Sequence, residues 1–354
     1  MLAEDDAGAL AQGDERDFPA VEARYYKRLP GNKVECELCP NKCRVADLER
    51  GTCGVRENRG GTYYTLVHSR AAAAHVDPME KKPLFHFLPG SLAFSIATAG
   101  CNMECRFCQN WEISQFRPEQ VRAMKLTPRD VHEMARRSGA PAIAYTYSEP
   151  TIFYEYMFDT AKLGQTTGIK SVVISAGFTE EKPLKDLLPV VDAIKIDLKS
   201  FRQDFYDKIC RGKLESVQKT IEIIHNSNKW LELVVLIVPT LNDSEAEMKD
   251  MARWVKSTLG PDVPMHFSRF HPTYRLRDLP RTPAATIQRC CDIARAEGIR
   301  YVYVGNMPGH PAESTYCPKC GERVIERVGL SLASNRLQAG RCPKCATQIP
   351  GVWS

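Results

Sequence analysis

Residues 91–111 read SLAFSIATAGCNMECRFCQNW, an apolar run followed at once by three closely spaced cysteines. The run 91–98 is typical of a buried strand, so Cys101, Cys105 and Cys108 are expected on the loop at its carboxyl end. In α/β barrels and open sheets, active sites and ligand sites lie at this end of the strands. The C-x3-C-x2-C spacing therefore marks a candidate functional loop.

Strand-like and helix-like segments alternate after this run. The further β-rich runs are 142–147, 171–175, 193–198, 231–238, 265–270 and 301–304. Helix starts between them carry cap signals, such as Thr127-Pro128 with Asp130 three residues after the threonine. Strict alternation predicts an α/β fold with a parallel sheet, open or closed into a full or partial barrel.

Charge and hydropathy narrow the class of protein. Lys and Arg number 48 against 43 Asp and Glu, and the resulting net charge of +5 is too small to indicate a nucleic-acid partner. No apolar run reaches the length that a bilayer needs, and the start of the chain is acidic where a secretory signal would be basic. These features predict a cytoplasmic protein without a membrane partner. Residues 1–24 carry seven acids and two basic residues, which predicts a mobile tail.

Fourteen cysteines are unusual for such a protein. Because a reducing compartment disfavours disulfides, clustered cysteines there indicate metal or redox chemistry. Beside the central triplet there are two groups of four: Cys36, Cys39, Cys43 and Cys53 near the N-terminus, and Cys317, Cys320, Cys342 and Cys345 near the C-terminus. The remaining three, Cys210, Cys290 and Cys291, fall in helical patterns and are expected to be small buried apolar residues.

The two groups of four support different expectations. The C-terminal group consists of two C-x2-C pairs, which is a signature of a four-thiolate zinc ribbon; a rubredoxin-like iron site is the alternative. The N-terminal group has the spacing C-x2-C-x3-C-x9-C and is also sufficient for four thiolates. It is interpreted as a structural metal site, with a second iron–sulfur cluster that feeds electrons to the first as the sharper hypothesis.

The central triplet suits a cubane 4Fe-4S cluster, which four cysteines normally hold. No fourth cysteine is nearby, and an iron with an open position can bind a substrate or cofactor, as a catalytic zinc does. A three-cysteine zinc site with a distant histidine and a chance triplet are the alternatives. The spacing, with the aromatic Phe107 before the third cysteine, resembles the radical S-adenosylmethionine (SAM) superfamily.

This resemblance implies a radical SAM partial (β/α)6 TIM-like barrel and an enzyme that uses a 4Fe-4S cluster and SAM. In such enzymes the reduced cluster cleaves SAM to methionine and a 5′-deoxyadenosyl radical, which abstracts hydrogen from the substrate. An electron donor of the flavodoxin or ferredoxin type is implied as a partner.

The resemblance also implies which residues bind SAM. They are Phe107, Glu149, Asp197, Lys199 and His271. Glu149 follows the second run in Tyr-Ser-Glu-Pro and competes with an N-cap role ahead of Pro150. Asp197 and Lys199 match the Asp-Leu-Lys of glycyl-radical activating enzymes, with a surface pair as the alternative. His271 is as easily structural, and Asn242 and Asp243 are explained as well by a turn as by function.

A narrower resemblance follows from the combination of DPMEKKPLFHFLPGS at 77–91 with YSEPT, IDLKSF, VPTLND and YVYVGNMPGHPAESTYCPKCG. Together these motifs resemble the radical SAM protein of the AmmeMemoRadiSam system, a relative of pyruvate formate-lyase activating enzymes. The place of Lys81, Lys82 and His86 in this family motif implies that they reach the mouth of the site. The other proteins of that system are then expected partners.

The resulting expectation has four segments: a tail at 1–24, a cysteine-rich metal-binding segment at 25–89, the barrel at 90–305 and a zinc ribbon at 306–354. Three activities remain open, on a small molecule or lipid precursor, on a partner protein, or on RNA. A non-catalytic metal-binding module is the fourth possibility.

Overall fold

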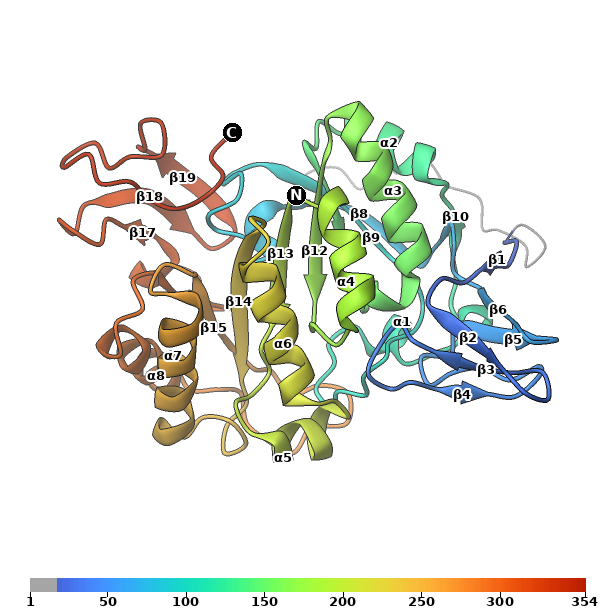
Figure 1. Ribbon diagram of the computed structural model, residues 1–354. Helices are drawn as coiled ribbons and strands as arrows, with labels where there is room; N and C mark the ends of the chain where they lie inside the picture. The colour runs from blue at the N-terminus through green and yellow to red at the C-terminus, as the bar shows by residue number, and fades with distance from the viewer. Residues whose placement is uncertain (1–17) are drawn as a thin grey trace.

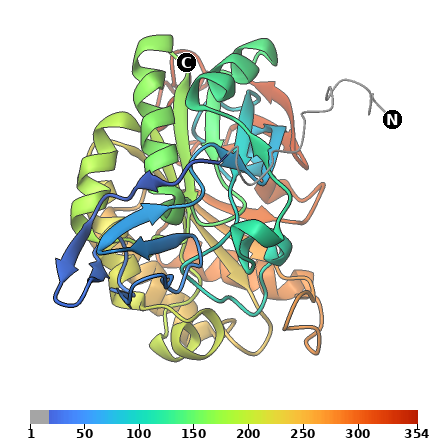
Figure 2. The same ribbon diagram turned by 90° about the vertical axis from the view of Figure 1, so that its right-hand side faces the viewer.

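The computed structural model describes residues 18–354, and its centre is an eight-stranded sheet (Figures 1 and 2). In spatial order its strands are β16 (Val302–Gly305), β15 (Met265–Arg269), β14 (Trp230–Ile237), β13 (Ala193–Asp197), β12 (Lys170–Ser175), β11 (Ala142–Tyr145), β9 (Leu92–Ala97) and β8 (Ala73–Pro78). The seven strands from β9 to β16 pair in parallel, and β8 pairs antiparallel with β9. The predicted parallel α/β arrangement is confirmed.

Helices connect successive parallel strands and cover the outside of the sheet (Figure 1). The long ones are α2 (Pro128–Arg137), α3 (Tyr154–Thr167), α4 (Glu181–Leu187), α6 (Leu214–His225), α7 (Glu245–Leu259) and α8 (Ala284–Ala296). Thr127 and Asp130 form the predicted capping box at the start of α2. No helix within residues 18–354 is long and apolar enough to cross a membrane.

The N-terminal region forms two small antiparallel sheets beside the barrel (Figure 2). Their strands are β1 (Val21–Glu22), β6 (Thr62–Thr65) and β5 (Arg56–Arg59) in one, and β2 (Tyr26–Leu29), β3 (Lys33–Cys36) and β4 (Arg44–Val45) in the other. Arg56 docks them on α3 through a buried ion pair with Glu155, 2.6 Å long. Most of the predicted tail, residues 1–17, lies outside the described residues, whereas β1 belongs to this region.

The C-terminal region adds one further antiparallel sheet, formed by β17 (Thr315–Tyr316), β18 (Arg323–Val328) and β19 (Ser331–Asn335). Arg327 of β18 is fully buried and pairs with Glu80 at 3.3 Å. It also donates to the carbonyl of Phe85. The sheet is thereby attached to the segment that crosses from β8 to β9, at the amino-terminal end of the barrel strands (Figure 1).

Three short helices and one strand pair complete the connections. The helices are α1 (Trp111–Ser114), α5 (Gln203–Phe205) and the π-helical turn η6 (Tyr206–Cys210), and the pair is β7 (Arg70–Ala71) with β10 (Met124–Lys125). The loop after β9 and the turn η6 both lie at the carboxyl end of the barrel, and they meet there through backbone hydrogen bonds. This contact positions the cysteine loop.

Candidate active site

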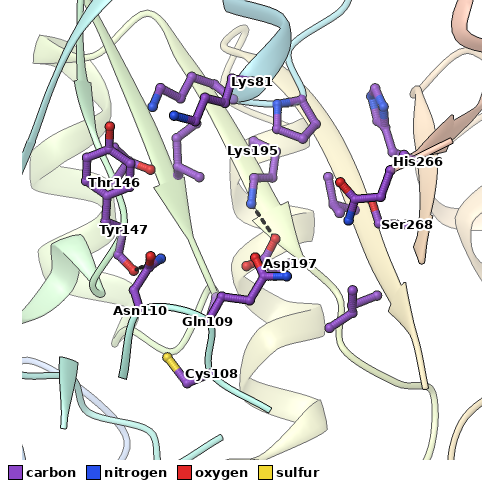
Figure 3. Close-up of a pocket in the computed structure, with 18 of the residues that line it drawn as sticks. Lys81, Cys108, Gln109, Asn110, Thr146, Tyr147, Lys195, Asp197, His266 and Ser268 are labelled. Carbon is purple, nitrogen blue, oxygen red and sulfur yellow. Dashed lines mark hydrogen bonds and ion pairs between the residues drawn. The ribbon is translucent and has the colours of Figure 1, made fainter. Parts of the chain in front are cut away.

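A cavity of about 610 Å³ extends from the cysteine loop into the barrel (Figure 3). A volume of this size is typical of small-molecule and cofactor sites. Its wall is formed by side chains from the ends of several strands together with Lys81 and Lys82 from the crossing segment. Cys101, Cys105 and Cys108 all line it.

The cysteine loop is fixed from two sides. Gly100 has a φ of +92°, and a Cβ there would lie 2.7 Å from the carbonyl oxygen of Cys53, so only glycine fits against the N-terminal region. On the other side, the backbone amides of Glu104 and Arg106 donate to the carbonyls of Cys210 and Ile209, both at 2.9 Å. The loop is therefore preorganised by two segments that are distant in sequence.

The three thiols of this loop have different surroundings. Burial raises the pKa of Cys101, and the charge of Glu149 adds to the rise. The pKa of Cys105 is lowered, chiefly because the thiol of Cys210 hydrogen bonds to it. Burial also raises the pKa of Cys108, although a hydrogen bond with Ser114 opposes the shift. Three thiols on one loop that face one cavity suit three irons of a cubane cluster.

Cys210 ends η6 and has a contact that the sequence did not predict. It is buried, as expected, but it contacts a proposed cluster ligand, whereas Cys290 and Cys291 are buried in α8. Cys105 and Cys210 are 105 positions apart, and no pattern in the sequence indicated their contact.

Glu149 lines the cavity and also caps η4 (Pro150–Phe153). Its Oε1 accepts from the amide and hydroxyl of Thr151 and from the hydroxyl of Ser175. Its Oε2 accepts from the amide of Ala176 at 2.8 Å. The structure therefore confirms the capping role, and Oε2, which has a single hydrogen-bond donor among residues 18–354, has capacity for another.

Asp197 and Lys199 come together at the end of β13. Lys199 approaches Asp197 at 3.5 Å, and Lys195, from the same strand, pairs with the other carboxylate oxygen (Figure 3). Burial works to raise the pKa of Asp197, but the two lysines outweigh it and lower the pKa below its usual value. Lys195 was missed from the sequence, although residues two apart on a strand share a face.

Phe107 and His271 differ in position. Phe107 is buried at the cavity wall, with the Lys199 ammonium 5.7 Å from its ring centroid. His271 is not among the lining residues within 18–354; it follows β15 near Arg269 and Arg281, whose charges add to desolvation in lowering its pKa.

Asn242 and Asp243 form a turn after β14. Asn242 is buried and donates to the carbonyl of Lys199 at 2.7 Å, so it holds the backbone of a proposed SAM contact. Asp243 accepts from the amide of Thr240. The structure therefore shows both residues stabilising a turn and the backbone beside it.

The crossing segment supplies two lysines to the cavity but not its histidine. Lys82 is 2% exposed, and burial lowers its pKa to about 8, although a hydrogen bond to Asp77 opposes the shift. His86 is completely buried, with its ring nitrogens at the carbonyl of Pro350 and the hydroxyl of Tyr303. The expectation that His86 reaches the site is therefore wrong, because the segment crosses the amino-terminal end of the barrel strands at this point.

The C-terminal cysteines converge. Their four sulfur atoms all lie within 4.8 Å of one another, and Sγ of Cys317 is 3.5 Å from Sγ of Cys345. A tetrahedral ion with metal–sulfur bonds of about 2.3 Å places its ligands about 3.8 Å apart. This group therefore fits a single metal ion. Among the N-terminal cysteines, Cys36 ends β3, Cys39 and Cys43 lie between β3 and β4, and Cys53 lies before β5, where its carbonyl packs against Gly100.

Comparison with known proteins agrees with this geometry. The family model described as "Radical SAM superfamily" matches residues 95–255. The uncharacterized protein MJ0808 of Methanocaldococcus jannaschii is 42% identical over 330 residues, which cover 93% of this chain and 98% of the relative. The pyruvate formate-lyase-activating enzyme of Clostridium pasteurianum is 22% identical over 196 residues, 51% of this chain and 80% of that enzyme.

Among solved structures, a radical SAM methyltransferase from Sphaerobacter thermophilus has the same fold. The TM-score is 0.51 at 18% identity, and the match covers 62% of this chain and 67% of that one. Fold, cysteine loop and relatives lead to one conclusion. The chain belongs to the radical SAM superfamily, with similarity to pyruvate formate-lyase activating enzymes, and is an iron–sulfur, SAM-dependent enzyme.

Proposed function

We propose that this enzyme binds SAM between the cysteine loop and the end of β13 and acts on a small polar molecule deeper in the barrel. The observation that carries the proposal is the cavity of about 610 Å³ that three thiols of one loop share with Glu149, Asp197 and Lys199. When bound, a 4Fe-4S cluster supplies the electron that cleaves SAM to methionine and a 5′-deoxyadenosyl radical.

The chain's own residues would bind the cluster and orient SAM. Cys101, Cys105 and Cys108 would hold the cluster, and Phe107 would shield it from water. The acceptor capacity of Glu149 suits the SAM amino group, while Asp197 and Lys199 suit its other polar groups. Because His271 lies away from the cavity lining, the proposed SAM site rests on the other residues.

The deeper part of the cavity supports a polar substrate. Lys195 precedes Asp197 by two residues on β13, which puts it roughly 7 Å farther from the carboxyl end. With Lys81 and Lys82 it offers ammonium donors, whereas the oxygens of Asp77 and Asp197 are already engaged by lysines. Each of these ammonium groups has three donor hydrogens and pairs with one carboxylate. The remaining donors favour a substrate with carboxylate or phosphate oxygens over a lipid precursor.

The outer parts of the enzyme have proposed roles as well. The spacing and convergence of the C-terminal thiols support a zinc ribbon that holds the wall of the cavity through Arg327 and Glu80. The sequence motifs at 77–91 and 301–321 support membership of the AmmeMemoRadiSam system, with its other proteins as partners. A flavodoxin or ferredoxin would supply electrons.

Activation of a partner protein is the second candidate. The similarity to a pyruvate formate-lyase-activating enzyme favours it. In that case the hydrogen donor would be a residue of a protein rather than a small molecule.

A fractionation experiment distinguishes the two. Anaerobically reconstituted enzyme receives SAM, a strong reductant and either the low-molecular-weight or the macromolecular fraction of a cell extract. We expect 5′-deoxyadenosine formation to rise about tenfold or more with the low-molecular-weight fraction, and anion exchange to remove the stimulating compound. Stimulation by the macromolecular fraction alone would favour the partner protein.

A charge variant gives this experiment its control. Lys81→Gln should weaken stimulation because it removes a cation from the cavity wall. Lys185→Gln removes an equally charged surface side chain on α4 and should leave stimulation unchanged. Equal behaviour of the two variants would contradict the proposed substrate class.

A further inference from the structure

We propose that Cys36, Cys39, Cys43 and Cys53 bind a second iron–sulfur cluster that passes electrons to the cluster on the central cysteine loop. The relay rests on the proposed SAM-cleaving function, whereas the metal site itself does not. In each cycle a reduced flavodoxin or ferredoxin would give one electron to the second cluster. That cluster would be reoxidised as it reduces the first, and SAM would accept the electron.

The four cysteines are gathered by the local fold. Cys36 ends β3, and its amide donates to the carbonyl of Cys43 at 2.9 Å across a tight turn. Within this turn the amide of Lys42 donates to the carbonyl of Cys39. Cys53 enters from the loop before β5. Cys36 and Cys39 are buried, while Cys43 and Cys53 are partly exposed.

The distances between thiols distinguish this group from the C-terminal one. Within residues 18–354, the C-terminal cysteines are the one set of three or more possible ligands whose atoms all lie within 4.8 Å of one another. The central triplet does not meet this limit, and neither do any three of the N-terminal four. A single tetrahedral zinc needs thiolates about 3.8 Å apart. In a cubane each thiolate binds a different iron, so wider spacing is required.

A buried arginine provides a second, independent observation. Arg56 is 1% exposed, and its Nε has no hydrogen-bond partner among the described residues. Arg56 begins β5 and follows Cys53 by three residues, so its buried guanidinium belongs to the same region of the fold. A buried donor without an acceptor indicates a missing one. A sulfur atom of an anionic cluster would supply the acceptor.

The site adjoins the central cysteine loop directly. The side-chain amide of Asn41 donates to the carbonyl of Asn102 at 2.8 Å, and the Cys53 carbonyl packs on Gly100. Asn102 follows Cys101 in the chain, and Asn41 lies between Cys39 and Cys43. The hydrogen bond between Asn41 and Asn102 therefore joins the two cysteine groups, and this proximity favours electron transfer between them.

Metal analysis tests the site. Reconstituted wild-type protein should contain about eight irons, and the triple variant Cys101→Ala, Cys105→Ala, Cys108→Ala about four. The electron paramagnetic resonance signal of the reduced triple variant should not respond to SAM. Adding Cys39→Ala to the triple variant should remove the remaining iron, whereas adding Cys290→Ala, a buried cysteine of α8, should not. About four irons in the wild type with zinc at the N-terminal site would overturn the proposal.

Activity measurements test the relay. Cys39→Ala alone should cleave SAM with a strong chemical reductant at a rate near wild type and slow at least tenfold with reduced flavodoxin. Equal rates with flavodoxin in the two proteins would overturn the relay. Four irons in the triple variant without SAM cleavage by the wild type would instead reject the proposed function and leave the second cluster standing.

Discussion

The two groups of four cysteines belong to regions on opposite sides of the barrel, one with the sheet of β2, β3 and β4 and the other with the sheet of β17, β18 and β19 (Figure 1). The C-terminal thiols converge within 4.8 Å of one another near the amino-terminal end of β16. The N-terminal thiols are more widely spaced and adjoin the cysteine loop at the carboxyl end. We therefore propose different roles for two groups with equal numbers of thiols, on the basis of the spacing of the thiols and their distance from the cavity.

The two regions are nevertheless docked in the same way. Each attaches to the barrel through one buried arginine and one buried glutamate, Arg56 with Glu155 and Arg327 with Glu80. Removing one partner of such a pair leaves an uncompensated buried charge. Mechanical attachment and metal chemistry can therefore be tested separately.

The largest effect is expected from separating the central loop from the C-terminal group. Cys105→Ala should abolish SAM cleavage and remove about four irons while the zinc content stays unchanged. Cys320→Ala should lose zinc and keep the central iron. Metal content and 5′-deoxyadenosine are measured on the same preparations, and loss of both metals in either variant would refute the separation of the sites.

Breaking the docking pairs comes next. Arg327→Met and Arg56→Met should each lower the free energy of unfolding of the metal-free protein by about 3–5 kcal/mol, because a buried glutamate loses its partner. Arg253→Met breaks an exposed pair with Glu297 and should cost far less, because solvent screens exposed charges. Denaturant titration gives these values, and a cost for Arg327→Met no larger than that for Arg253→Met would contradict the role of the pair.

A pH titration examines the segment that joins the C-terminal sheet to the cavity. Lys82 should lose its proton near pH 8, well below the pKa of an ordinary lysine, because burial disfavours its charge. Trace acetylation at increasing pH, read by mass spectrometry, should show this midpoint. Since Asp77 opposes the shift, Asp77→Asn should move the midpoint still lower. A midpoint near 10 would show that the segment is open to solvent.

The smallest effect concerns Cys210. Its hydrogen bond to Cys105 withdraws charge from a proposed cluster ligand, so Cys210→Ala should make the potential of the SAM-responsive cluster more negative, on the order of tens of mV. Redox titration followed by electron paramagnetic resonance measures the change, with Cys290→Ala as the control. An unchanged or more positive potential would show that Cys210 only fills space.

Local patterns in the sequence were sufficient to predict the α/β fold. The alternation of β-rich runs with capped helical segments predicted the parallel sheet, and the Thr127–Asp130 box formed as expected. Cysteine spacing located the candidate sites because loop ligands lie close in sequence. Lys195 was within reach of the same reasoning, since it shares a strand face with Asp197.

Contacts between distant segments could not be predicted in this way. Cys210 meets Cys105, and Asn41 meets Asn102, through tertiary packing that leaves no periodic signal. The path of the crossing segment under the barrel is a similar case, and it buried His86 where the motif had suggested exposure. Positions near the cavity are thus fixed by global topology more than by local sequence.

The central claim is that this protein cleaves SAM with a cluster held by Cys101, Cys105 and Cys108. Its most direct test is the formation of 5′-deoxyadenosine by anaerobically reconstituted wild-type protein with SAM and a strong reductant. We predict release of 5′-deoxyadenosine and methionine in equal amounts. Protein that assembles no iron–sulfur cluster and releases no 5′-deoxyadenosine would contradict the account.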